Sequence, residues 1–154
     1  MPKLLICLLS ALLLASAVEL PTKKYLNLAA VKKLVATAEA EAAKHNVSVT
    51  ICIVDESGNL LFLQKGDTAG YNTLEFAQKK ARYAALFGRP SAAAAEQLKN
   101  GNTAVLAYPN AFPNQGGVPI KVDGKVIGGM SCSGAASEVD EAISQAAVDA
   151  LLKE

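Results

Sequence analysis

The sequence lacks the residue patterns by which most common catalytic and metal-binding classes are recognised. It contains no P-loop, no Gly-x-Ser-x-Gly, no His-Glu-x-x-His and no Cys-x-x-Cys. These absences exclude P-loop nucleotide hydrolases, α/β-hydrolases and the common zinc peptidases. The single histidine, His45, falls at the expected end of a helix, where its cation would suit the negative pole of the helix dipole. No Cys or His spacing typical of a metal site is present, so we predict no metal site.

The chain also lacks an excess of charge of either sign. Lys and Arg number 15 against 14 Asp and Glu, for a formal net charge of +1. There is no basic tail and no interleaving of basic and aromatic residues, so we expect no nucleic-acid partner. Cysteine is limited to three residues, of which Cys52 and Cys132 fall in strand-like runs. We expect these two to be buried free thiols; a disulfide is the alternative that export would permit.

The N-terminus carries an apolar run that has the form of a targeting signal. Lys3 precedes LLICLLSALLL, and Ala15-Ser16-Ala17 has the small-x-small form of a signal-peptidase site. The run is shorter than the roughly 20 residues that span a bilayer. We predict a cleaved signal peptide over residues 1–17 and one domain over residues 18–154; a retained N-terminal anchor is the alternative. The mature protein would be secreted or lie in an endomembrane or periplasmic lumen, outside the membrane itself.

Hydrophobic periodicity and turn residues predict a mixed α and β domain. Helices are expected over residues 27–45, 72–87, 92–99 and from 137 onward, with strands over 47–54 and 60–63 and a hairpin around Asp123-Gly124. Asn27, Asn72, Ser91 and Ser137 stand where N-caps are expected, Asn72 with Glu75 and Ser137 with Asp140 in the form of capping boxes. Residues 103–108 form either a fifth strand or part of a pocket rim. The expected fold is α+β, one domain with an antiparallel sheet of about five strands flanked by helices.

The helix over residues 72–87 has two faces of different character. Phe76, Lys80, Tyr83 and Phe87 share one side, and Ala77, Ala81, Ala84 and Gly88 share the other. The small side can approach a sheet or another helix closely. Lys80 has two interpretations: its charge snorkels to the surface, or it waits at the edge of an aromatic pocket for an anionic ligand. On the second interpretation, Lys80→Met should weaken ligand binding and leave thermal stability almost unchanged.

The stretch FPNQGGVPIKVDGKVIGGMSCSG, residues 112–134, combines a hairpin with glycine-rich loops at both ends. Proline fixes φ and glycine admits positive φ, so the segment around Gly116 and Gly117 is a shaped loop that permits close approach. Such a hairpin is a candidate pocket wall; an ordinary hairpin with ordinary turns is the alternative. The adjacent acidic residues Asp140 and Glu141 do not face each other on a helix, so we interpret them as N-terminal charge on the last helix.

These segments together resemble a known family. VTICIVDESGNLLFLQKGD, FAQKKARYAALFGRPS and FPNQGGVPIKVDGKVIGGMSCSGAASEVDEAISQAA are similar to the small haem-degrading, GlcG-like domain family over about residues 29–152. The resemblance implies a profilin-like fold, assembly into homo-oligomers, and haem as a cofactor of several members. It matches Lys80-Ala81, Gly116 to Pro119, Ser133-Gly134 and Asp140-Glu141 to the family's motifs. Gln64 to Asp67 and Ser131-Cys132 depart from the family pattern.

The resemblance and the residue patterns together define a predicted ligand site. Its residues are Lys80, Tyr83, Phe112, Gln115, Gly116, Gly117 and Gly134. The first functional hypothesis is a secreted protein that binds haem or a related tetrapyrrole and promotes its oxidative degradation. For His45 we expect a structural or solvent-facing role; an axial ligand to the haem iron is the alternative. The second is an enzyme that uses the same pocket for acid/base chemistry on another small molecule, through Lys80 or Tyr83. A third, a purely structural oligomer, is disfavoured by the glycine-rich loops.

Overall fold

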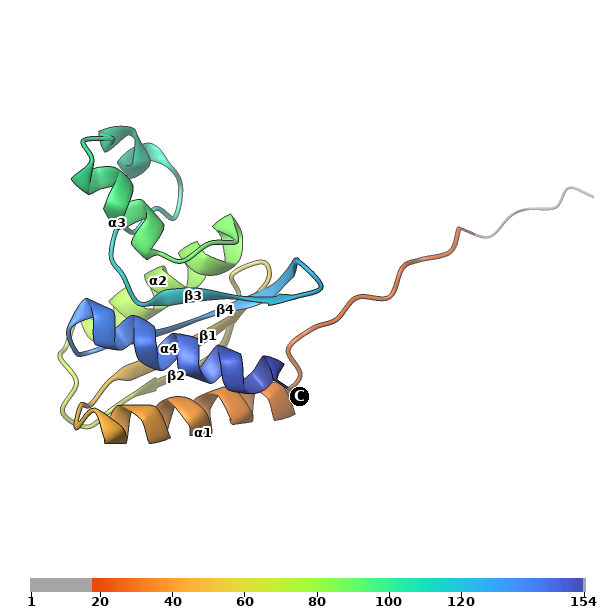
Figure 1. Cartoon of the computed structure of the whole chain (residues 1–154). Helices are drawn as coiled ribbons and strands as arrows, with labels where there is room; N and C mark the ends of the chain where they lie inside the picture. Colours follow the sequence, from red (N-terminus) through yellow and green to blue (C-terminus); the bar gives the residue numbers. More distant parts are fainter. Residues whose placement is uncertain (1–17, 154) are drawn as a thin grey trace, which may run out of the picture.

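The computed structural model describes residues 18–153, so the predicted signal peptide over residues 1–17 lies outside the described residues. The elements follow the order α1 (Leu28–Lys44), β1 (Thr50–Asp55), β2 (Leu60–Lys65), α2 (Thr73–Phe87), α3 (Ala92–Lys99), a 3-10 helix η1 (Thr103–Ala107), β3 (Gly117–Val122), β4 (Lys125–Ser133) and α4 (Ser137–Leu152). The α+β class and the single domain are confirmed (Figure 1).

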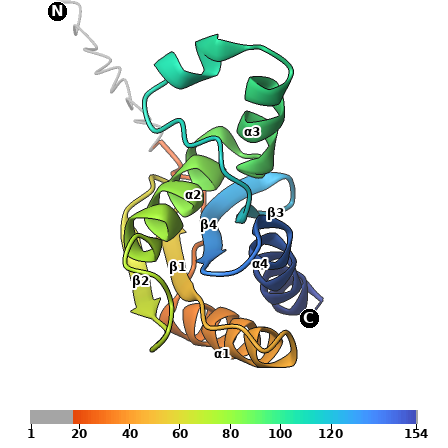
Figure 2. The ribbon, with the colours of Figure 1, turned by 90° about the vertical axis from the view of Figure 1, so that its left-hand side faces the viewer.

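The strands form one antiparallel sheet in the order β2-β1-β4-β3. Helices α1 and α4 pack together on one face, and α2 covers the other face (Figures 1 and 2). Helix α3 and η1 form an arm that projects beyond α2. This arrangement brings the start of α2 and the start of α4 to the same end of the sheet, because β4 runs directly into α4 there.

The described residues contain four strands, where about five were expected, because residues 103–107 form η1 instead of a strand. Val105 explains the difference. Its side chain is buried in a small cluster with Tyr83 of α2 and Ala94 of α3. The main apolar residue of this segment is therefore buried within the arm and not against the sheet. No alternating pattern remains that would pair it with a sheet edge.

Two separate apolar clusters lie on the two faces of the sheet, and β1 contributes to both. Val49, Ile51 and Ile53 face α1 and α4, as the alternation over 47–54 predicted, whereas Cys52 and Val54 face α2. Cys132 belongs to the α1 and α4 side. The two cysteines therefore point to opposite faces of the sheet. Both are free and buried, which confirms the expectation for the thiols.

Only one of the four expected side-chain caps is present. Asn27 accepts a hydrogen bond from the Ala30 amide at 2.9 Å, as predicted. Asn72, Ser91 and Ser137 make no capping hydrogen bond. Tertiary partners explain part of this difference, since the Ser91 hydroxyl accepts from the Gly117 amide at 2.9 Å. The expected capping boxes at α2 and α4 are therefore wrong.

The small-residue side of α2 packs against the sheet of its own chain. Ala77, Ala81 and Ala85 are buried against Cys52 and Val54. A Cβ atom at Gly129 of β4 would lie 2.4 Å from the Ala81 carbonyl oxygen, so glycine is required for this close approach. The fit leaves no room for a larger side chain on either partner.

Ala81→Leu is therefore expected to lower the free energy of unfolding by about 1–3 kcal/mol through overpacking. Urea denaturation of the purified domain measures this change. Ala43→Leu, at an exposed position of α1, is the matched control and should change stability little, because leucine is a good helix former. Equal stability of the Ala81 variant and the wild type would show that α2 does not pack as described.

Candidate functional site

A buried ion pair joins α2 to α4. The Lys80 ammonium Nζ lies 3.0 Å from the Asp140 carboxylate Oδ2, and the two side chains are 1% and 4% exposed. Burial lowers the pKa of Lys80 below the ordinary lysine value, and the charge of Asp140 only partly offsets that effect. Lys80 therefore does not snorkel to the surface. Asp140 is the buried partner of a cation, and this corrects its interpretation as a simple helix-terminal charge.

The paired glycines allow the loop before β3 to close over Lys80. A Cβ atom at Gly116, whose φ is +126°, would lie 2.6 Å from Lys80 Nζ. A Cβ atom at Gly117 would lie 2.3 Å from the Lys80 carbonyl oxygen. Both glycines are thus required for contact between the loop and α2. Close approach was predicted correctly, but what approaches these glycines in the structure is the protein's own lysine.

Further hydrogen bonds hold the two carboxylate oxygens and the surrounding backbone in place. Asp140 Oδ1 accepts from the Ala135 amide at 3.0 Å, just before α4 begins. The Ser144 hydroxyl accepts from the Cys132 amide at 2.8 Å and lies 2.9 Å from the Gly116 carbonyl oxygen. The ion pair is therefore embedded in contacts from β4, α4 and the glycine loop, which fix its geometry.

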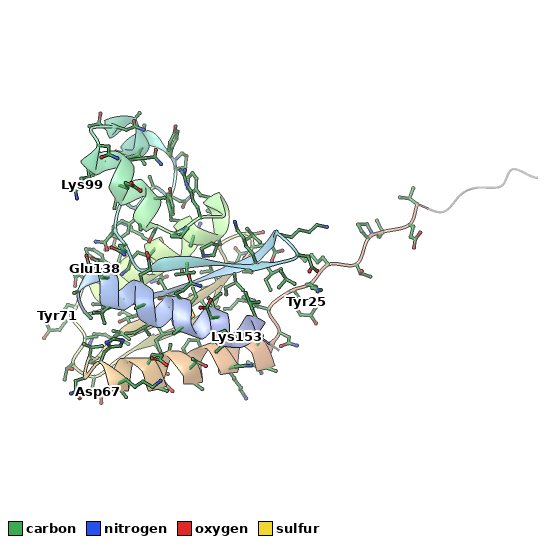
Figure 3. The ribbon with its side chains drawn as sticks, viewed as in Figure 1. Tyr25, Asp67, Tyr71, Lys99, Glu138 and Lys153 are labelled. Carbon is green, nitrogen blue, oxygen red and sulfur yellow. The ribbon has the colours of Figure 1, made fainter. Side chains whose placement is uncertain are left out.

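A polar cavity of about 270 Å³ lies beside this pair, where α2 and α4 begin. Asp140 forms part of its wall, and Gly134 lines it as well. The other lining residues are Gly70, Asn72, Thr73, Phe76, Asn114, Ser133, Ala135 and Ser137. Tyr71 and Glu138, which flank the two helix starts, lie at the same end of the molecule, opposite Tyr25 (Figure 3). We take this cavity as the candidate site.

The structure divides the seven predicted site residues among four places. Lys80, Gly116 and Gly117 meet around the ion pair behind the cavity, and Gly134 lines the cavity itself. Tyr83 lies elsewhere. It is fully buried in the arm cluster, where it stacks on Phe87 with ring centroids 4.4 Å apart and its hydroxyl accepts from Arg89 Nε at 3.0 Å.

The two remaining predicted residues belong to the loop before β3. Phe112 packs edge-on against Phe76 at 5.1 Å between ring centroids, and Lys79 Nζ lies 5.5 Å from the Phe112 centroid. Because Phe76 lines the cavity, this aromatic pair extends its rim. Gln115 is half-buried in the loop. The aromatic rim was thus partly predicted, with Phe76 in place of Tyr83 as the partner of Phe112.

Sequence reasoning missed Ser133, Thr73 and Asn114 as lining residues and Asp140 as the partner of Lys80. One signal could have identified Asp140: it shares a helical stripe with the buried Ile143 and Ala147, where a carboxylate needs a partner. Residues 18–153 contain no cluster of three or more His, Cys, Asp or Glu suited to a metal ion. His45 is exposed at the end of α1.

The comparison with protein-family models decides the relationship. The model of haem-degrading, HbpS-like proteins matches residues 26–149. The chain belongs to the HbpS-like family. The family resemblance found in the sequence is thereby confirmed, and the match runs from two residues before α1 to Asp149, three residues before the end of α4.

Individual relatives agree with this placement. Protein GlcG of Escherichia coli strain K12 is 37% identical over 112 residues, which cover 73% of this chain and 84% of GlcG. A double mutant of Streptomyces reticuli HbpS has a TM-score of 0.79 and 28% identity, covering 89% of this chain and 94% of that chain. The PduOC:heme complex has a TM-score of 0.76 and 25% identity, covering 82% and 95%. No helix in the described part of this HbpS-like chain is long and apolar enough to cross a membrane.

Proposed function

We propose that this HbpS-like protein binds haem or a related tetrapyrrole at the end of the domain where α2 and α4 begin. The observation that carries the proposal is the family match over residues 26–149, in a fold shared with a protein solved as a haem complex. Degradation of the bound haem in the presence of an oxidant is part of the proposal. When bound, the haem iron supplies that chemistry, and the protein supplies the pocket and the orientation.

The residues at this end suit parts of haem other than its iron. The Phe76–Phe112 pair offers a half-buried aromatic surface for the ring. Lys79 lies beside Phe112 and, although it pairs with the exposed Glu75 at 2.7 Å, it offers a cation for an anionic edge. The cavity lining contains no His, Cys, Met or Tyr that would ligate iron in the common ways. We therefore propose that the ring and its edge groups provide most of the affinity.

Phe112→Ala is expected to weaken haemin binding about two- to tenfold, because it removes an aromatic contact worth about 0.5–1.5 kcal/mol. Titration of haemin, followed by its absorbance spectrum, measures the affinity. Tyr25→Ala removes a more exposed aromatic residue from the opposite end of the domain and is the matched control. A wild-type protein that leaves the haemin spectrum unchanged would defeat the proposed function; equal affinity of the Phe112 variant would move the site elsewhere.

A second candidate is an enzyme that uses acid/base chemistry on another small molecule in the same cavity. It is favoured by Asp140, a buried carboxylate at the cavity wall whose partner Lys80 has a lowered pKa. In such an enzyme, Asp140 or Lys80 would transfer a proton to or from a small substrate in the cavity, and haem would not be needed. A thermal-shift screen of small alcohols and other molecules without a carboxylate separates the two candidates, since only the second predicts stabilisation by such a haem-free ligand.

We also propose that the mature protein is secreted, or delivered to a lumen, and that it forms homo-oligomers. Exposed leucines on β2 and α2, namely Leu60, Leu61 and Leu86, offer apolar surface for assembly. Cleavage after Ala17 should give a mature N-terminus at Val18. N-terminal sequencing of protein from its natural source tests this prediction, and a chain that still begins at Met1 or Pro2 would contradict it.

A further inference from the structure

We propose that the cavity between the starts of α2 and α4 is a subsite for a carboxylate group, with the Ser133 hydroxyl as a donor. The inference deepens the proposed function and, for one of two sources of the carboxylate, rests on it. Either a propionate of haem or a free small carboxylic acid carries the required group. At about 270 Å³, the cavity is below the usual range for whole drug-sized ligands, so it suits an edge group or a very small acid.

Ser133 is the residue that points to a ligand. It is 4% exposed, lines the cavity, and makes no side-chain hydrogen bond within residues 18–153. The hydroxyls around it are occupied: Thr50, opposite it on β1, bonds Thr73 at 2.7 Å, and Ser131 bonds the Ala77 carbonyl oxygen. The Ser133 side chain is almost fully buried, but its hydroxyl oxygen is not among the fully buried atoms that lack a partner, so it is reached from the cavity. A group that enters the cavity is therefore the partner open to this hydroxyl.

The two helix starts add donors to this hydroxyl. In α4, the first amides with partners are those of Val139 and Asp140, both bonded to the Ala136 carbonyl oxygen at 2.9 Å. The amides of Ser137 and Glu138 precede them and have no partner among the described residues, and α4 has no side-chain cap. Helix α2 begins without a side-chain cap as well. Unpaired amides and the positive ends of two helix dipoles favour an anion.

Asp140 is the one group in the wall that opposes an anion. Its charge is balanced by Lys80, and both of its oxygens accept hydrogen bonds, one from Lys80 and one from the Ala135 amide. The Asp140–Lys80 pair is therefore close to neutral, and the free donors lie on Ser133 and at the start of α4. Such a wall suits a single planar carboxylate, which can accept from Ser133 and from a helix amide at the same time.

Ser133→Ala is the first test, because it removes only the hydroxyl oxygen. Ser137→Asp is the second: it places a negative charge in the cavity wall, and the helix dipole favours an acidic residue in the first turn, which opposes the repulsion from Asp140 three residues on. Ala142→Glu, on the exposed side of the same helix, adds an equal charge away from the cavity and is the control. The probes are sodium acetate, haemin and haemin dimethyl ester, in which both propionates are blocked.

Acetate binding is followed by NMR shifts of the Ser133, Ser137 and Glu138 amides, and the two haemins are followed by absorbance. If the carboxylate belongs to haem, haemin should bind the Ser133 and Ser137 variants at least about tenfold more weakly, and the ester should bind all forms alike. If it belongs to a free acid, acetate should shift the three amides in the wild type and not in Ser137→Asp, whatever haemin does. Haemin that fails to bind even the wild type, with acetate shifts intact, would overturn the proposed function and support the subsite.

Two results would overturn the subsite itself. One is haemin affinity that is unchanged in both variants together with no acetate shift at the three amides, which would mean that the cavity holds only water. The other is equal losses in Ala142→Glu and Ser137→Asp, which would make the effect one of overall charge. Folding of each variant is checked by its thermal unfolding transition, and Ser137→Asp keeps the test valid if Ser133→Ala does not fold.

Discussion

Replacing Lys80 with Met is expected to lower the free energy of unfolding by about 3–5 kcal/mol. The substitution leaves the Asp140 carboxylate buried without its cation, and an uncompensated buried charge is costly. This expectation reverses the one drawn from the sequence, in which the lysine stem alone mattered for stability. Denaturation in urea at neutral pH measures the loss, and a variant of wild-type stability would show that Lys80 and Asp140 do not pair in solution.

A double-mutant cycle separates the ion pair from other effects of the substitution. Asp140→Asn removes the charge but keeps an oxygen that can accept from the Ala135 amide. In the Lys80→Met background, Asp140→Asn should therefore recover most of the lost stability, because no unpaired charge remains. Simple addition of the two single losses in the double variant would argue against direct coupling between the two side chains.

Alkaline pH is expected to destabilise the domain through its two buried thiols. Burial raises the pKa of Cys52 and of Cys132 from 9.0 to about 12. Below pH 9 both the folded and the unfolded chain keep these protons, so the thiols make stability independent of pH there. Between pH 9 and about 12, only the unfolded chain releases them, and stability falls by up to about 4 kcal/mol per thiol as pH rises.

The measurement compares unfolding free energies of the wild type and of the Cys52→Ala, Cys132→Ala double variant from pH 8 to pH 11. Other groups titrate in this range, but they are common to both proteins. The wild type should lose stability relative to the double variant as pH rises. Parallel curves would mean that the thiols titrate normally. The same burial predicts that neither native thiol reacts with a thiol reagent at pH 8, because the thiolate fraction is very small.

The parts of the fold that sequence reasoning predicted well are those governed by local patterns. The cap at Asn27 and the alternation through Ile51 and Ile53 depend on residues only a few positions apart. The other expected caps were wrong. At Ser91, the side chain forms a hydrogen bond with a residue distant in the sequence instead of capping its own helix. The Ser91 hydroxyl bonds the Gly117 amide, 26 residues away. Local propensity cannot show such competition, since the competing group is remote in the chain.

Of the seven predicted site residues, only Gly134 lines the candidate cavity. Lys80, Gly116 and Gly117 do lie together, as their sequence features suggested, but Lys80 is paired with Asp140, 60 residues away. The helical stripe placed Lys80 and Tyr83 on one side of α2. It could not show that Tyr83 is buried in a separate cluster with Ala94 and Val105 of the arm. Ser133 was matched to a family motif, but its unpaired hydroxyl could not be predicted, because that is a property of the assembled cavity.

The strand order β2-β1-β4-β3 also determines how the chain folds. The pairs β1–β2 and β3–β4 are local, whereas the central pair joins Thr50 to Ser133 across 83 positions. The sheet is complete only when that long loop, with α2 and the arm inside it, has closed. Topologies dominated by such distant contacts fold more slowly than helical proteins of similar size.

The free-energy cost of closing this loop depends only weakly on its length, with each doubling of the length costing about 0.6 kcal/mol. The arm can therefore accept insertions at little thermodynamic cost.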